Sequence, residues 1–283
     1  MTITQNVVNH YAASDLLDAI RSGLEALGKR VDALTIDDLA PVDEFHIGGR
    51  AATEQLFNAL ELTTDMNVLD VGCGLGGPAR LAATRYGAKV AGIDVTPDYV
   101  RAGSEICSWL PVAGRVSLQQ GDALALPFAD ATFDRAYMMH VGMNIVDKFA
   151  LIREIRRVLR PGGAFGVYDI MRVGDGELTF PLPWATTAET SAVAEPADYR
   201  RALEAAGFVR ITQRVRDDLA RAFFERLAAS ASASGGPPPL GLHLVMGKNT
   251  RDKVRNLIDD VTSGRIAPVE MIARYDERTT VSS

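Results

Sequence analysis

Few residues in this chain of 283 can build a metal centre or a disulfide scaffold. Its two cysteines, Cys73 and Cys107, are too few for a disulfide framework and are typical of a reducing interior. Its four histidines, at positions 10, 46, 140 and 243, do not have the spacing of metal ligands. We therefore expect no metal site.

The chain also lacks an excess of basic residues and any long apolar run. Its net charge is −6 and its pI is near 5.3, and no basic stripe of the kind that tracks phosphates dominates it. The longest basic cluster, at 153–160, alternates with apolar residues, which predicts the wet face of an amphipathic helix. No leader resembles a signal peptide, and no apolar run is long enough to span a membrane. These features predict a cytoplasmic protein with neither nucleic-acid nor membrane partners.

Glycine, in contrast, is concentrated at one predicted strand-to-helix junction. Residues 66–78 read MNVLDVGCGLGGP, in which Gly72, Gly74 and Gly77 lead from an apolar strand into an Ala-rich helix. Glycine permits positive φ and close approach to a ligand, and a helix N-terminus offers free N–H groups. Many nucleotide binders share this G-x-G-x-x-G pattern. Asp70, just before the first glycine, would repel a pyrophosphate and instead suits a ligand that carries positive charge.

Strand-like and helix-like segments alternate from residue 66 to about 214, which predicts an α/β fold with a parallel sheet and right-handed crossovers. The predicted strands are 67–71, 89–93, 115–119, 133–138, 163–169, 208–215 and 268–274, and the predicted helices between them are 78–86, 97–108, 146–159 and 196–206.

Two helical segments lie outside this alternation. Residues 1–60 carry apolar residues at helical spacing and are expected to form an N-terminal helical cover. The remaining domain, 61–283, contains a helical insertion at about 217–265, before the last strand. The insertion is expected to act as a lid, or else as a packing or dimerisation element, so that a homodimer is one outcome.

Carboxylates follow two further predicted strands. Asp94, after the strand at 89–93, suits the two hydroxyls of a ribose, with a helix cap or turn residue as the alternative. Asp122, after 115–119, can accept from an adenine amino group while the N–H of Ala123 reaches a ring nitrogen, with a turn aspartate as the alternative. Because ligands of open α/β sheets lie beyond the carboxyl ends of the strands, we expect these residues beside the glycine loop.

Four segments, in this order, resemble the class I S-adenosylmethionine-dependent methyltransferases: VLDVGCGLGG, GIDVTP, GDALALPFADATFD and RVLRPGG, over about residues 66–170. The resemblance is to small-molecule members, of the glycine/sarcosine or natural-product type. It implies a Rossmann-like seven-stranded sheet with helices on both faces and an antiparallel last strand. It also implies S-adenosylmethionine as the methyl donor. This cofactor has a sulfonium and an ammonium and no pyrophosphate, in agreement with the charge argument for Asp70.

The resemblance also assigns cofactor-binding residues, all of them in or beside the loops that follow the first four predicted strands. They are Asp70 near the ammonium, Gly72, Gly74 and Gly77 along the methionine portion, Asp94 at the ribose, Asp122 and Ala123 at the adenine, and Val95 and Met139 beside them.

His140 is the candidate catalytic residue, because it ends the fourth predicted strand, which the family places beside the transferable methyl group. It can act as a general base or orient the acceptor by a hydrogen bond. The alternative is a histidine that only packs against the cofactor. Asn144, four residues later, can hydrogen-bond a polar acceptor or cap the helix that starts near Asp147.

Four more residues are candidates for acceptor binding. Asp169, at the end of the fifth predicted strand, can orient an amine or hydroxyl, or make a loop hydrogen bond. Trp184 can form an apolar wall. Tyr11 and His46 resemble the N-terminal parts that cover the cofactor in small-molecule members, and for His46 we expect a structural rather than a catalytic role.

The acceptor is expected to be a small molecule. The Asn-Pro-Pro-Tyr signature of nucleic-acid and glutamine amino methyltransferases is absent, as is the metal-binding pair of the catechol type. The predicted function is in-line transfer of a methyl group from S-adenosylmethionine to N or O of a small metabolite. The alternatives are C-methylation of a natural-product, quinone or sterol-like acceptor, and cofactor binding without catalysis. A nicotinamide-dependent oxidoreductase is the remaining, weaker alternative.

Overall fold

The computed structural model describes residue 10 and residues 15–112, 114–233 and 237–276. Its core is one seven-stranded sheet with the strand order β3-β2-β1-β4-β5-β7-β6. The strands are β1 Asn67–Val71, β2 Lys89–Asp94, β3 Val116–Gln120, β4 Phe133–Met139, β5 Leu159–Arg172, β6 Val209–Val215 and β7 Ile266–Arg274. Strands β1 to β5 pair in parallel, and β7 runs antiparallel to both β5 and β6. The predicted Rossmann-like α/β fold and its antiparallel last strand are confirmed.

Strand β5 is longer than the predicted 163–169. It begins at Leu159, directly after a helix, and its pairing with β4 shifts register so that Phe133 faces Leu159 whereas Arg135 faces Ala164. The Pro161-Gly162-Gly163 segment therefore lies in an irregular part of the strand. At its other end β5 continues to Arg172, past Asp169.

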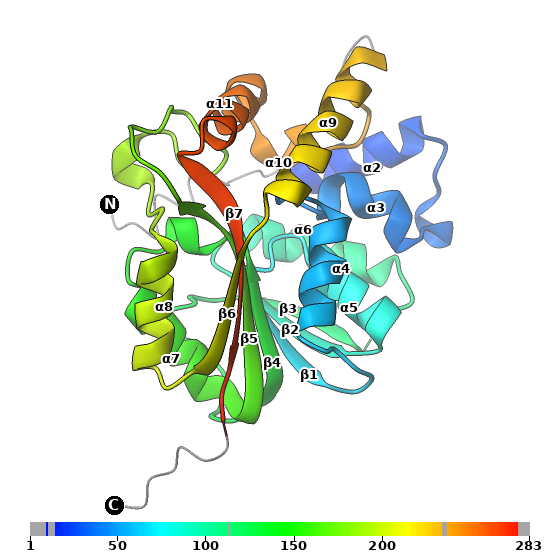
Figure 1. The fold of residues 1–283 in the computed structure, drawn as a ribbon. Helices are drawn as coiled ribbons and strands as arrows, with labels where there is room; N and C mark the ends of the chain where they lie inside the picture. Colours follow the sequence, from blue (N-terminus) through cyan, green and yellow to red (C-terminus); the bar gives the residue numbers. More distant parts are fainter. Residues whose placement is uncertain (1–9, 11–14, 113, 234–236, 277–283) are drawn as a thin grey trace, which may run out of the picture.

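Helices cover both faces of the sheet (Figure 1). On one face lie α7 Lys148–Val158 and α8 Pro196–Ala205, and on the other α4 Arg50–Ala59, α5 Gly77–Tyr86 and α6 Pro97–Ser108. Each face has its own apolar cluster: in β4, Tyr137 packs in one cluster and its neighbour Met138 in the other. Such burial on both faces explains why the strands read as nearly continuous apolar runs.

A third layer lies above the carboxyl ends of the parallel strands (Figure 1). It contains α2 Leu16–Ala26 and α3 Ile36–Asp43 from the predicted cover, and α9 Asp217–Ala233, α10 His243–Met246 and α11 Thr250–Thr262 from the predicted insertion. We call α9, α10 and α11, with the described residues 237–242 and 247–249 that join them, the roof. A third apolar cluster connects α9 and α11 to residues 178–185.

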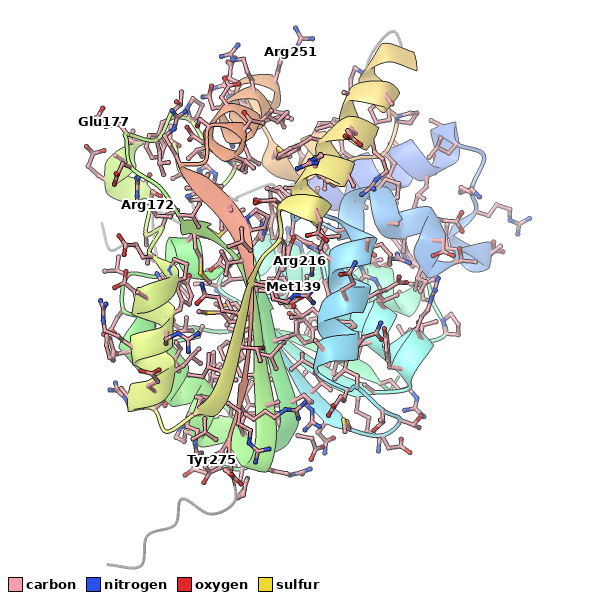
Figure 2. All side chains as sticks on the ribbon, viewed as in Figure 1. Met139, Arg172, Glu177, Arg216, Arg251 and Tyr275 are labelled. Atoms are coloured by element: carbon pink, nitrogen blue, oxygen red, sulfur yellow. The ribbon has the colours of Figure 1, made fainter. Side chains whose placement is uncertain are left out.

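The two ends of the strands differ in what lies beside them. Met139, at the end of β4, is near the helical layer, whereas Tyr275, directly after β7, is at the opposite end of the sheet (Figure 2). The loops that hold the candidate site residues therefore lie at the same end of the sheet as Met139, under the roof. No helix in the described ranges is both long and apolar enough to cross a membrane.

Candidate active site

A cavity of about 330 Å³ lies between the carboxyl ends of the strands and the roof. Its wall has three parts: the loops after β1, β2 and β3; the end of β4 with residues 140–147; and a cover made of residues 42–47, Pro183, Trp184 and side chains of the roof. The positions of the strand ends predicted the first two parts of the cavity wall. Most residues of the third part belong to segments that carry no sequence motif.

The glycine loop and Asp94 are joined by hydrogen bonds. Gly72 and Gly74 have φ values of +74° and +52°, a backbone conformation that favours glycine, and both line the cavity. The N–H of Gly74 donates to Oδ2 of Asp94 over 2.9 Å, and the N–H of Thr96 donates to Oδ1 over 2.8 Å. Asp94 thus fixes the glycine loop against the end of β2 and still faces the cavity, as does Val95.

Gly77 differs from the other two motif glycines, because it is not among the residues that line the cavity. A Cβ atom there would lie 2.5 Å from Cβ of Asp43, at the end of α3. The third glycine therefore allows close packing of α3 against α5, and the expectation that it lines the methionine portion does not match its position.

Asp70 is buried in the cavity wall, with 3% of its surface exposed. Its Oδ2 and the hydroxyl of Tyr137 lie close enough to interact, and within the described residues neither atom has another hydrogen-bond partner. Burial raises the pKa of Asp70 to about 7; the Tyr137 hydroxyl opposes this shift, and the charge of Asp94 adds to it. A cationic group in the cavity would favour the charged carboxylate.

Asp122 and Ala123 also line the cavity, at the end of β3. Oδ1 of Asp122 accepts a hydrogen bond from the N–H of Leu124 over 2.9 Å, so this residue makes the turn that was its alternative interpretation. Its side chain is exposed and keeps a second oxygen for a ligand. Met139 lines the same cavity from β4.

His140 faces the cavity at the end of β4 in a strained conformation, with φ of +55°. Its backbone N–H donates to the backbone carbonyl of Tyr168. Its ring stacks on the Tyr168 ring, with the two ring centroids 5.6 Å apart. Nε2 of His140 is buried and has no hydrogen-bond partner among the described residues. Burial, and to a smaller extent His46, hold the pKa of His140 well below 6.5, so the ring is neutral at pH 7.

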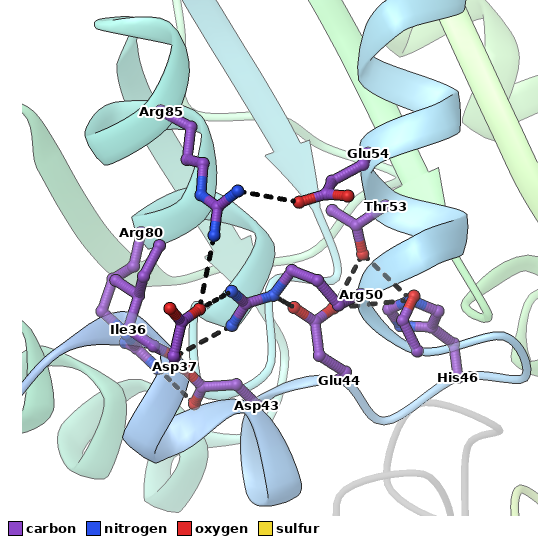
Figure 3. Close-up of polar contacts among 11 residues, drawn as sticks. Ile36, Asp37, Asp43, Glu44, His46, Arg50, Thr53, Glu54, Arg80 and Arg85 are labelled. Carbon is purple, nitrogen blue, oxygen red and sulfur yellow. Dashed lines mark hydrogen bonds and ion pairs between the residues drawn. The ribbon is translucent and has the colours of Figure 1, made fainter. Parts of the chain in front are cut away.

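His46 lies beside His140, with ring centroids 5.9 Å apart, and is bound by a polar network from α4 (Figure 3). The Thr53 hydroxyl donates to Oε2 of Glu44 over 2.7 Å, and Arg50 donates to Oε1 of Glu44 over 2.7 Å. Nε2 of His46 lies 3.1 Å from both the Thr53 hydroxyl and the carbonyl of Gly49.

This network fixes the tautomer of His46. The single hydroxyl proton of Thr53 is directed to Glu44, so Nε2 of His46 must be the donor to its two neighbours. Nδ1 then carries the lone pair. Burial lowers the pKa of His46, partly opposed by Glu44, so this ring is also neutral. No local pattern predicts this network, although Glu44 stands two residues before His46.

Asn144 lines the cavity and does not cap α7. Asp147 caps that helix, because its Oδ1 accepts from the N–H of Ala150 over 2.8 Å. Nδ2 of Asn144 donates to the carbonyl of Val141 over 3.3 Å, while its buried Oδ1 has no partner in the described part of the chain. Asn144 and His140 therefore offer two unpaired polar atoms at one end of the sheet.

Trp184 lines the cavity as an apolar wall, and its indole N–H donates to the Ser191 hydroxyl over 3.0 Å. Asp169 does not line the cavity. Because β5 continues to Arg172, Asp169 lies within the strand, fully buried, and accepts from the Tyr199 hydroxyl over 2.6 Å. The expectation that Asp169 contacts the acceptor is therefore not supported by its position. Tyr11 lies outside the described residues.

Sequence reasoning missed many of the residues that line the cavity, among them Phe45, Thr96, Tyr99, Phe223 and Leu257. Thr96 could have been found from its place just after the Asp94 strand end. The others come from helices or from the segment before α4, and only their packing shows that they meet at one cavity.

The residues of the first part of the cavity wall, at the ends of β1, β2 and β3, fit S-adenosylmethionine. The buried carboxylate oxygen of Asp70 suits an ammonium, and Asp94 and Asp122 offer acceptors for hydroxyl and amino groups. Over the described ranges, no group of three or more His, Cys, Asp or Glu side chains is arranged to hold a metal ion.

Comparison with known proteins agrees with this site. Residues 68–163 match the family described as "Methyltransferase domain". The methyltransferase GfsG of Streptomyces halstedii is 34% identical over 198 residues, which are 69% of each chain. The chain belongs to the class I S-adenosylmethionine-dependent methyltransferases that act on small molecules. It is therefore an enzyme of this class, and S-adenosylmethionine is its cofactor.

Solved structures share the fold at lower identity. The [4+2]-cyclase SpnF is 23% identical with a TM-score of 0.70, over 96% of this chain and 97% of that one. A geranyl diphosphate C-methyltransferase from Streptomyces coelicolor A3(2), solved with Mg²⁺, geranyl-S-thiolodiphosphate and S-adenosylhomocysteine, is 18% identical with a TM-score of 0.69, over 97% and 98% of the two chains.

Proposed function

We propose that this protein transfers the methyl group of S-adenosylmethionine to an oxygen or nitrogen atom of a small molecule. The observation that carries the proposal is His140 Nε2, which is buried in the cavity wall, neutral, and unpaired among the described residues. A neutral imidazole at this point can take the proton that an O–H or N–H acceptor loses as it attacks.

Bound S-adenosylmethionine supplies a methyl group on a positively charged sulfur, so the transfer requires alignment more than activation. Asp70 and Asp94 hold the cofactor by their carboxylates. His140 and Asn144 orient the acceptor, whose O–H or N–H can donate to Asn144 Oδ1 or His140 Nε2. The roof and Trp184 exclude water from the reacting groups. His46, with its fixed tautomer, offers a second neutral nitrogen beside His140.

Two alternatives lead to different expectations. Carbon methylation, named for the geranyl diphosphate enzyme, produces a carbocation when the nucleophile is an alkene, and a base such as His140 would then take a proton after the methyl transfer instead of during the attack. Binding of the cofactor without methyl transfer is the second alternative. The structural neighbour titled a [4+2]-cyclase illustrates that this fold does not by itself define the reaction.

The test combines cofactor titration with labelled methyl transfer. We expect S-adenosylmethionine and S-adenosylhomocysteine to bind by calorimetry, and nicotinamide dinucleotides not to bind. A panel of alcohols, phenols and amines with labelled cofactor then identifies an acceptor. With that acceptor, His140→Ala should lower kcat by about 10²–10⁴-fold, the typical range for a general base, and leave cofactor affinity nearly intact.

The matched control is His243→Ala, because His243 does not line the cavity and the same side chain is removed. Its turnover should equal that of the wild type. If His140→Ala keeps the wild-type rate from pH 6 to 9, the base assignment is wrong. If no alcohol, phenol or amine is methylated although the cofactor binds, the proposal is wrong and the two alternatives, carbon methylation and binding alone, replace it.

A further inference from the structure

We infer that the acceptor part of the cavity takes an uncharged, largely apolar molecule and discriminates against anions. This inference rests on the proposed function, since it names the class of molecule that the same site accepts.

The wall that faces away from the cofactor loops is apolar. Ile47, Met143, Trp184, Phe223 and Leu257 line the cavity and also belong to or pack against the third apolar cluster, which is separate from the two clusters on the sheet faces. These residues come from the segment before α4, the turn after β4, the 178–185 segment and the roof. Together these side chains offer the acceptor dispersion contacts and no charge.

No lysine or arginine is among the described residues that line the cavity. Among the residues whose structure is not described, 1–9, 11–14, 113, 234–236 and 277–283, Arg278 is the one residue of either type. The buried cations nearby are engaged elsewhere: Lys148 donates to three backbone carbonyls, Lys253 to the carbonyl of Met246, and Arg80 to Asp43. A carboxylate or phosphate group on the acceptor would therefore lose water and gain no cationic partner.

The charges that do face the cavity are negative. Asp70, Asp94, Asp122 and Asp147 line it, as does Asp43, which is paired with Arg80, and His46 and His140 are neutral. An anionic acceptor would meet repulsion as well as desolvation. An uncharged acceptor has its polar group satisfied by His140 Nε2 and Asn144 Oδ1, which are unpaired among the described residues.

The test uses two fluorescent probes with the same ring systems, one neutral and one anionic. N-phenylnaphthylamine is uncharged, and anilinonaphthalene sulfonate adds one sulfonate. Both are titrated into protein saturated with S-adenosylhomocysteine, so that the cofactor side is filled. We expect the neutral probe to bind at least tenfold more tightly than the sulfonate.

Variants locate the probes. Phe223→Arg adds a cation inside the cavity and should reduce or reverse the tenfold preference, and Leu257→Arg serves the same purpose if Phe223→Arg fails to fold. Val209→Arg, at an exposed position on β6 outside the cavity, should leave the preference unchanged.

Three results would overturn the inference. They are tighter or equal binding of the sulfonate to the wild type, no binding of either probe, and a preference that a folded Phe223→Arg variant leaves unaltered. None of them bears on methyl transfer. A protein that fails to bind the cofactor by calorimetry would instead contradict the proposed function, and the probe preference can then be measured without the cofactor.

Discussion

At the scale of single residues, Asp70 combines burial with a place in the part of the cavity wall that we propose binds the cationic cofactor. Burial raises its pKa to about 7, so below pH 7 the free protein holds a neutral carboxyl there. A ligand with an ammonium group binds the charged form more tightly. Cofactor affinity should therefore fall as the pH drops from 8 to 6, by up to about tenfold per pH unit below 7.

Calorimetry of S-adenosylhomocysteine binding checks this prediction. At pH 6, in two buffers of different ionisation enthalpy, binding should release a proton. Asp70→Asn removes the titrating group, so its affinity should be weaker and independent of pH over this range. Wild-type binding that is equally tight at pH 6 and pH 8, without proton release, would contradict the prediction.

The same substitution tests the effect of Asp70 on stability. Its folded pKa lies above the unfolded value near 3.8, so the folded protein binds more protons between pH 4 and 7. The contribution of Asp70 is favourable below pH 4 and is lost as the pH rises through 7. Relative to the wild type, cofactor-free Asp70→Asn should gain stability over this interval, by roughly 1.4 kcal/mol per unit of pKa difference at most.

Sequence reasoning predicted residues that line the cavity where a strand end marks their position. Asp94 is the last residue of β2, and His140 directly follows β4. Both residues line the cavity. The same rule failed for Asp169, because β5 extends three residues further than predicted and takes that side chain into the interior. The tautomer of His46 depends on Thr53, seven residues away across a turn, and no local pattern encodes that contact.

At the scale of elements, the start of α7 fixes the turn that carries His140 and Asn144. Lys148, buried at this end, donates to the carbonyls of Gly142, Ile145 and Ala192. Its ammonium also lies 5.3 Å from the Tyr199 ring centroid. Asp169 faces the same cluster and, through its charge, raises the pKa of Lys148 against the effect of burial. Asp169 thus acts on the site indirectly, through the Lys148 ammonium that holds the turn.

Lys148→Met should be strongly destabilising, because it leaves three carbonyls and the Asp169 carboxylate without their cation. We expect a loss of about 3 kcal/mol in the free energy of unfolding. Urea denaturation measures it, with Lys248→Met as the matched control at an exposed position, where the change should stay within about 0.5 kcal/mol. If both variants unfold at the same urea concentration as the wild type, Lys148 does not support this turn.

At the scale of the whole molecule, the cavity is assembled from regions far apart in the sequence. Residues 42–47, the strand ends and the roof each supply part of its wall. The sequence predicted the sheet and the positions of the helical segments, because periodicity and turn residues are local. Which roof side chains meet the glycine loop depends on how α9, α10 and α11 pack, and local patterns do not contain that information.

A direct link joins the cofactor side to the roof. The hydroxyl of Tyr99, on α6 after β2, donates to the carbonyl of Val245 in α10 over 2.9 Å, and both residues line the cavity. A ligand beside the glycine loop should therefore stabilise α10 and α11 as well as its immediate contacts. We expect S-adenosylhomocysteine to slow amide hydrogen exchange at 243–262 in addition to 70–77 and 94–96.

Tyr99→Phe removes this hydrogen bond, worth about 1 kcal/mol, and should reduce the ligand-induced protection at 243–246 while the protection at 70–77 remains. Tyr86→Phe is the matched control, because its hydroxyl donates to Asn58 and it does not line the cavity. Protection confined to 70–77 and 94–96 in the wild type would show that the roof does not respond to the cofactor. The insertion would then act as a packing or dimerisation element, whereas slowed exchange across 243–262 supports a lid that closes over the bound ligand.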